Sequence, residues 1–108
     1  MHSPKLKKFI ETEDGRLKQT VESYPDNEKR SFARMIKLTE EVGELADEVL
    51  ARGSFQRKEK LSEYAAGSIE GEFADVIITS LLLAKTLELD VDKALREKID
   101  KINKRYDK

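Results

Sequence analysis

Apolar residues recur at intervals of three and four along most of this chain, which is the period of an amphipathic helix. The clearest case covers residues 27–52 and carries the apolar series Met35, Leu38, Val42, Leu45 and Val49. Asp26 or Asn27 can cap the start of this segment, and Gly53 can end it. The pattern therefore predicts one long helix over this range.

Three further segments have the same helical period. Residues 5–21 form the first, with Gly15 as its weak point. Another begins somewhere between residues 62 and 68 and runs to residue 87, and the last follows Asp90, which is placed to act as its N-cap. No alternation typical of a β-strand competes, so we predict an all-α fold in which residues 1–108 form a single domain.

The helix predicted to end at residue 87 is apolar around much of its circumference between residues 73 and 87. Such a helix needs cover on several sides. Four helices of this size provide limited cover, so we predict a four-helix bundle completed by homo-oligomerisation, as a homodimer or a dimer of dimers. Phe9 and Phe32 are expected in its core.

Composition narrows the classes of partner and chemistry. The formal net charge is -1 over 108 residues, with both signs interspersed, which gives no signature of nucleic-acid or membrane binding. The absence of cysteine excludes disulfides, thiolate metal sites and cysteine catalysis. The first residues do not resemble a signal peptide, and a cytoplasmic location is expected.

Two carboxylate clusters stand out within the apolar series. Glu40, Glu41 and Glu44 lie in the long helix, and Glu72 and Asp75 lie in the next one. Residues three apart share a helix face, so two antiparallel helices could bring four carboxylates together. Oxygen donors of this kind suit Mg²⁺, which also engages substrate phosphates. The pattern therefore suggests a metal site that processes phosphates.

A solvated helix face is the plainer interpretation, because 40% of the residues are charged. Glu41, however, lies between Leu38 and Leu45, within the apolar series. A carboxylate buried there costs several kcal/mol unless it is neutralised, hydrogen-bonded or bound to a cation. Spacing alone leaves both interpretations open.

The segment Glu-Glu-Val-Gly-Glu-Leu over residues 40–45, followed 27 residues later by Glu-Phe-Ala-Asp-Val, resembles the MazG-like nucleoside triphosphate pyrophosphohydrolases. The resemblance covers roughly residues 37–106. It implies an all-α domain that cleaves the α–β phosphate bond of an NTP or dNTP to give a monophosphate and pyrophosphate. Nucleotide-pool house-cleaning is the expected role, while control of a deoxynucleotide pool and broad NTP hydrolysis stay open.

The same resemblance implies the roles of individual residues. Glu41, Glu44, Glu72 and Asp75 are the implied ligands of Mg²⁺, with Mn²⁺ as a substitute. Glu40, rotated by about 100° from Glu41, is implied to be an accessory catalytic group, and Glu41 or Glu44 to orient or deprotonate the attacking water. Which carboxylate is the base stays open.

Basic residues of the last helix are the expected phosphate contacts, and we single out Lys98, Lys101 and Arg105. A solvated helix face explains them equally well. The basic connector over residues 53–60 suits either a mobile loop near an anionic ligand or a plain linker.

Three alternatives remain open from sequence. Phosphoribosyl-ATP pyrophosphohydrolases belong to a related helical group and split the same kind of bond. The chain could instead be a non-catalytic helical oligomerisation or regulatory module that retains the scaffold. It could also be a plain amphipathic bundle that mediates protein contacts, in which the glutamates pair with lysines across helices.

Overall fold

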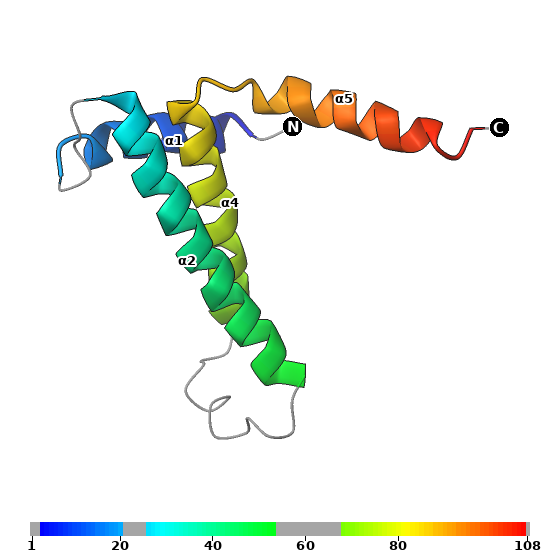
Figure 1. Ribbon diagram of the computed structural model, residues 1–108, viewed down its shortest axis with the longest axis horizontal. Coiled ribbons are helices and arrows are strands. Elements are labelled where there is room, and N and C mark those ends of the chain that lie inside the picture. The colour runs from blue at the N-terminus through cyan, green and yellow to red at the C-terminus, as the bar shows by residue number, and fades with distance from the viewer. Residues whose placement is uncertain (1–2, 21–25, 54–67, 108) are drawn as a thin grey trace.

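Four α-helices are seen in the computed structural model, which describes residues 3–20, 26–53 and 68–107 (Figure 1). In chain order they are α1 (Pro4–Leu17), α2 (Asn27–Gly53), α4 (Ser68–Thr86) and α5 (Val91–Lys104). The described residues contain no β-strand. The all-α prediction is confirmed.

Side-chain caps fix where these helices begin. The Asp26 carboxylate accepts the backbone N–H of Lys29 at 2.7 Å, and the Asp90 carboxylate accepts that of Lys93 at 3.0 Å. Both satisfy an N–H that has no partner within its own helix. The predicted caps of α2 and α5 are therefore confirmed.

The other predicted boundaries differ slightly or cannot be compared. Helix α1 ends at Leu17, before the predicted residue 21, which lies outside the described residues. The predicted connector beyond Gly53 and the predicted early start of α4, before Ser68, also lie outside them.

Helices α2 and α4 run antiparallel and in contact, and they form the long limb of the molecule (Figure 1). Helix α1 crosses one end of this pair and packs on α4. Helix α5 extends away from the pair (Figure 1).

The change of direction between α4 and α5 comes from a left-handed residue, Glu88, with φ 58°. The N–H of Leu89 donates to the Ala84 carbonyl at 2.9 Å, and that of Glu88 donates to the Lys85 carbonyl at 3.1 Å. This pair of bonds is a Schellman motif, in which glycine usually occupies the left-handed position. It ends α4 at Thr86, four residues before the Asp90 cap.

A buried ion pair joins α1 to the α2–α4 pair. Arg34 of α2 is 2% exposed, and its Nη1 donates to Asp14 Oδ1 of α1 at 2.6 Å. The same nitrogen lies 2.6 Å from Thr86 Oγ1 and 3.1 Å from the Leu82 carbonyl oxygen, both on α4. Three helices therefore meet at one guanidinium.

Burial alone would raise the pKa of Asp14, but hydrogen bonds from Arg34 and from Lys18 outweigh it and hold the pKa below its ordinary value. Lys18 Nζ lies 3.2 Å from Asp14 Oδ2. Asp14 is therefore ionised at neutral pH, which maintains the ion pair.

Few apolar side chains are buried in the part of the chain that the structure describes. They are Ile10, Ala51, Leu82 and Ala84. Phe9 is 38% exposed and Phe32 is 58% exposed, so the expectation that they lie in the core is wrong for the single chain. Among the described residues, no helix is both long and apolar enough to cross a bilayer.

Candidate functional site

Antiparallel packing of α2 on α4 brings together carboxylates that are far apart in sequence. Glu41 of α2 and both Glu72 and Asp75 of α4 each place one carboxylate oxygen within 4.8 Å of the others. The pairs were predicted to converge because each lies on one helix face. The convergence of Glu41, Glu72 and Asp75, hereafter the acidic cluster, agrees with that expectation.

Two carboxylates of the acidic cluster have oxygens that form no hydrogen bond with the described residues. Glu41 is buried, at 7% exposed, and Glu72 is half-buried. Glu41 Oε2 and Glu72 Oε2 are both inaccessible to solvent and have no hydrogen-bond partner among the described residues. An unsatisfied buried acceptor costs about 1–3 kcal/mol, and more when it is charged. The acidic cluster is therefore unfavourable without a cation or protons.

Electrostatics within the acidic cluster point the same way. Burial raises the pKa of Glu72, and the negative charge of Glu44 raises it further. A hydrogen bond between the two carboxyl groups, which needs one of them to be protonated, also raises this pKa. The charges of Asp75 and Glu41 raise the pKa further. A divalent cation between the carboxylates would remove this repulsion.

Glu44 lies beside the acidic cluster but is more accessible. Its side chain is exposed and interacts with Glu72, although it is not one of the three carboxylates with oxygens within 4.8 Å of one another. Glu44 is therefore accessible both to a cation in the cluster and to solvent.

Glu40 is separate from the acidic cluster, as its rotation about the helix axis predicts. Its side chain is 58% exposed, and its Oε2 lies 3.5 Å from Lys37 Nζ. Lys37 Nζ also lies 3.4 Å from Glu41 Oε1. Lys37 thus connects Glu40 to the cluster, and its hydrogen bond to Glu41 raises the pKa of the lysine, so its ammonium stays charged.

Reasoning from the sequence did not identify Lys37. The signal was available, because a lysine four residues before a glutamate on a helix is within reach of that carboxylate. It was obscured because 21 lysines and arginines are spread over the chain. The ion pair of Glu41 with Lys37 lies within α2, whereas the plain amphipathic bundle expects such pairs between helices.

A second buried glutamate was also missed. Glu48, two turns after Glu41, is completely buried, and its Oε1 accepts from Arg52 Nε at 2.9 Å. Helical spacing places it on the same side of α2 as Glu41. The α4-facing side of α2 therefore carries charge along its length, from Arg34 to Glu48.

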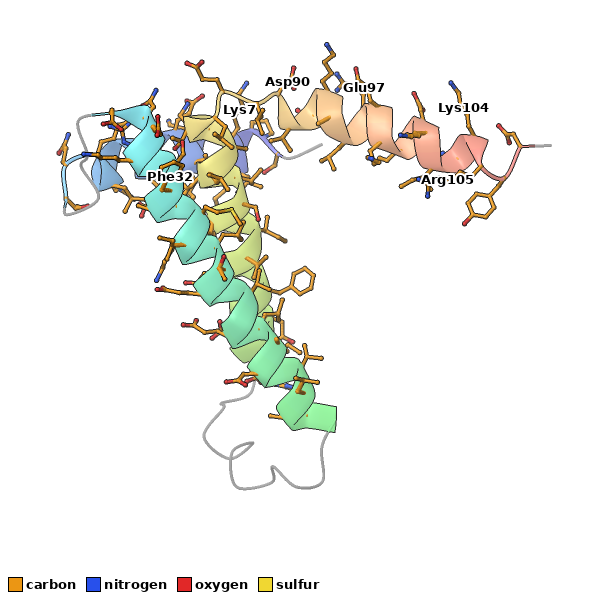
Figure 2. The ribbon with its side chains drawn as sticks, in the orientation of Figure 1. Lys7, Phe32, Asp90, Glu97, Lys104 and Arg105 are labelled. Carbon is orange, nitrogen blue, oxygen red and sulfur yellow. The ribbon has the colours of Figure 1, made fainter. Side chains whose placement is uncertain are left out.

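The three basic residues singled out on the last helix are not brought near the acidic cluster within one chain. Lys98 and Lys101 of α5 are exposed, as is Arg105, which caps its C-terminus, and α5 extends away from α2 and α4 (Figure 1). Figure 2 shows Arg105 near the far end of α5. They remain candidates for contacts that a single chain does not form.

Only carboxylate oxygens converge in the acidic cluster. Hard divalent cations prefer such donors, and Mg²⁺ in particular is held by a few carboxylates while it keeps other positions for water and phosphate. The unsatisfied oxygens of Glu41 and Glu72 provide the electrostatic reason for a cation to bind. The residues present therefore fit the predicted Mg²⁺.

Comparison with known proteins finds a family match over the part of the chain that contains the acidic residues. Residues 31–108 match the family model of the MazG nucleotide pyrophosphohydrolase domain. The uncharacterized protein YpjD of Bacillus subtilis (strain 168) is 36% identical over 74 residues, which are 68% of this chain and 65% of YpjD. The chain thus spans just under two thirds of that relative's length. No solved structure matches. The acidic cluster lies within the matched range, and the chain belongs to the MazG nucleotide pyrophosphohydrolase family.

Proposed function

We propose that this protein is a Mg²⁺-dependent nucleoside triphosphate pyrophosphohydrolase that cleaves the α–β phosphate bond of an NTP or dNTP, releasing a nucleoside monophosphate and pyrophosphate. House-cleaning of the nucleotide pool is the proposed role. One observation carries the proposal: in a chain of this family, carboxylate oxygens of Glu41, Glu72 and Asp75 converge within 4.8 Å of one another. Glu41 and Glu72 each also have a buried oxygen that lacks a partner among the described residues.

Each carboxylate has a proposed part. Glu41, Glu72 and Asp75 hold the cation, and Glu44 is the fourth ligand. When bound, Mg²⁺ supplies charge neutralisation at the phosphates and lowers the pKa of a water molecule. Glu40 is proposed as an accessory group, because its exposed carboxylate is linked to Glu41 through Lys37.

The bond changes in the proposed reaction follow from hydrolysis. A water oxygen forms a bond to one of the two phosphorus atoms that flank the bridging oxygen, and the bridging oxygen leaves with the electron pair of the broken bond. A carboxylate accepts the proton of the water. Glu44 is better placed than Glu41 for this part, because its side chain is exposed whereas Glu41 is buried.

The proposed domain covers residues 1–108, including the residues before the matched range. Asp14 of α1 forms its buried ion pair with Arg34 of α2, which lies inside that range. Breaking such a pair leaves an uncompensated buried charge. Helix α1 is therefore proposed to belong to the same domain as the acidic cluster.

A second copy of the chain is proposed to cover the apolar side of α2. Large apolar residues there are exposed, namely Phe32, Met35, Ile36, Val42, Val49 and Leu50. Phe73 and Ile77 of α4 and Leu95, Ile99 and Ile102 of α5 are exposed as well. An apolar surface of this extent, with so few apolar residues buried in the described part of the chain, favours a homodimer or a dimer of dimers. Light scattering gives the mass, and a monomer at micromolar concentration would contradict this proposal.

Product analysis tests the proposed reaction. Purified protein is incubated with a panel of NTPs, dNTPs and phosphoribosyl-ATP in Mg²⁺, and phosphate is distinguished from pyrophosphate. We expect pyrophosphate plus monophosphate, with loss of activity in EDTA. Glu41→Gln should lower the rate by more than about 100-fold, because even residues that only support metal ligands cost 10–100-fold. Glu11→Gln, an exposed carboxylate of α1, is the matched control.

Thermal melts separate the metal site from the non-catalytic alternative. Without Mg²⁺, Glu41→Gln should be as stable as the parent or more stable, because one carboxylate charge is removed from the acidic cluster. Mg²⁺ should stabilise the parent and not the variant. Turnover of phosphoribosyl-ATP alone would favour the related enzyme class, and absence of any turnover together with no Mg²⁺ effect would favour the oligomerisation module.

A further inference from the structure

Lys37 occupies a particular position relative to the acidic cluster. It lies one helical turn before Glu41, and its Nζ is 3.4 Å from Glu41 Oε1 and 3.5 Å from Glu40 Oε2. Its side chain is 51% exposed, whereas that of Glu41 is 9% exposed. The ammonium therefore lies at the solvent-facing edge of a buried carboxylate that the proposed function makes a metal ligand.

The two oxygens of Glu41 have different surroundings. Oε1 is paired with Lys37, whereas Oε2 is buried without a hydrogen-bond partner among the described residues. One cation is thus already present at one oxygen of the carboxylate. A divalent ion that takes the charge of Glu41 weakens the hold of that carboxylate on Lys37, because the same negative charge then attracts two cations.

We propose that Lys37 binds a phosphate oxygen of the substrate: its ammonium, which pairs with Glu40 and Glu41 in the metal-free protein, turns to the triphosphate once a divalent cation binds Glu41. This inference rests on the proposed function. It adds a basic residue of α2 to the site, whereas the basic residues of α5 extend away from the cluster of their own chain.

Side-chain chemistry supports this assignment. A triphosphate is strongly anionic and would enter a site made of carboxylates, so it needs cationic contacts beyond the metal. A lysine ammonium is a point charge on a flexible stem with three donors, which suits a phosphate oxygen whose position changes during binding. An exposed lysine loses little when it leaves one surface ion pair for another partner.

Three variants test the assignment. Lys37→Met keeps the length of the stem and its helix propensity but removes the charge. Lys37→Arg keeps the charge. Lys29→Met removes another exposed lysine of α2, about two turns before Lys37. It is the matched control because, among the described residues, Lys37 and not Lys29 forms the salt bridge with the acidic cluster.

Two binding measurements are needed besides turnover. Affinity for Mn²⁺ alone is measured without nucleotide, and affinity for inorganic triphosphate is measured in saturating Mn²⁺. For Lys37→Met we expect Mn²⁺ to bind up to about fivefold more tightly, because a competing surface cation is removed. We expect triphosphate affinity to fall about tenfold or more, since a charged hydrogen bond to phosphate is lost.

Turnover should show the same separation. The KM for the preferred nucleotide should rise about tenfold in Lys37→Met while kcat changes less than about threefold, which is the pattern of lost substrate binding. Lys37→Arg, which keeps the charge, should have a KM close to that of the parent, and Lys29→Met should have the same KM as the parent. A purely structural role for Lys37 would instead weaken Mn²⁺ and triphosphate binding together and lower the melting temperature.

The outcomes distinguish this inference from the function on which it rests. Unchanged triphosphate affinity and unchanged KM in Lys37→Met would overturn the role of Lys37 and leave the hydrolase proposal intact. If the parent hydrolyses no nucleotide, the proposed function fails, and the triphosphate measurement still decides: a tenfold loss in Lys37→Met supports the phosphate contact, and no loss refutes it.

Discussion

Removal of the Arg34 side chain is the most informative test of how the fold is held together. Arg34→Met keeps an apolar stem of similar length but deletes the guanidinium that lies 2.6 Å from both Asp14 Oδ1 and Thr86 Oγ1. Among the described residues, the carboxylate of Asp14, which is 5% exposed, would then keep the Lys18 ammonium at 3.2 Å as its one cationic partner. A buried carboxylate would lose its main partner.

The size of the effect follows from which groups lose their partners. Breaking a buried pair by removing one member costs about 3–5 kcal/mol. Thr86 Oγ1 still donates to the Leu82 carbonyl at 3.2 Å, and Lys18 still contacts Asp14, so each group keeps one partner. We therefore expect the lower end, about 3 kcal/mol. The free energy of unfolding of a protein is about 5–15 kcal/mol in total, so a loss of this size is large.

Urea unfolding followed by circular dichroism measures this loss, at one fixed protein concentration because association changes apparent stability. Lys29→Met is the control on the same helix. The double variant Arg34→Met, Asp14→Leu should recover most of the loss, because replacing both members of a buried pair with apolar residues is often neutral. A single variant that loses less than about 1 kcal/mol, with no recovery in the double variant, would refute the importance of this ion pair.

Two further predictions concern stability. The raised pKa of Glu72 means that the metal-free folded state binds a proton more tightly than the unfolded state, so the free energy of unfolding should fall as pH rises through that raised pKa. Saturating Mg²⁺ or Glu72→Gln should flatten the dependence of the free energy of unfolding on pH, measured in melts at a series of acidic to neutral pH values. A pH dependence that persists in Glu72→Gln would show that other groups cause it. Glu88→Gly should stabilise the protein by up to about 1 kcal/mol, because glycine adopts a positive φ without the Cβ clash. An unchanged melting temperature would contradict the inference that the positive φ of Glu88 costs free energy.

Helix boundaries were predictable where local chemistry decides them. Asp26 and Asp90 cap α2 and α5 as expected, because a carboxylate just before an apolar periodic segment satisfies the free N–H groups of its first turn. The left-handed Glu88 was not predictable, since glycine usually takes that position. Its conformation depends on the Schellman bonds of the folded chain.

The sequence by itself determined the helical period, the caps and the spacing that puts Glu72 and Asp75 on one face of α4, because these depend on residues within a few positions of each other. Only the tertiary structure decided that Glu41 approaches them, with buried oxygens that lack partners among the described residues. Burial and electrostatic coupling arise between helices, and no local pattern encodes them. The same holds for Arg34, an ordinary polar residue in sequence that becomes the buried junction of α1, α2 and α4.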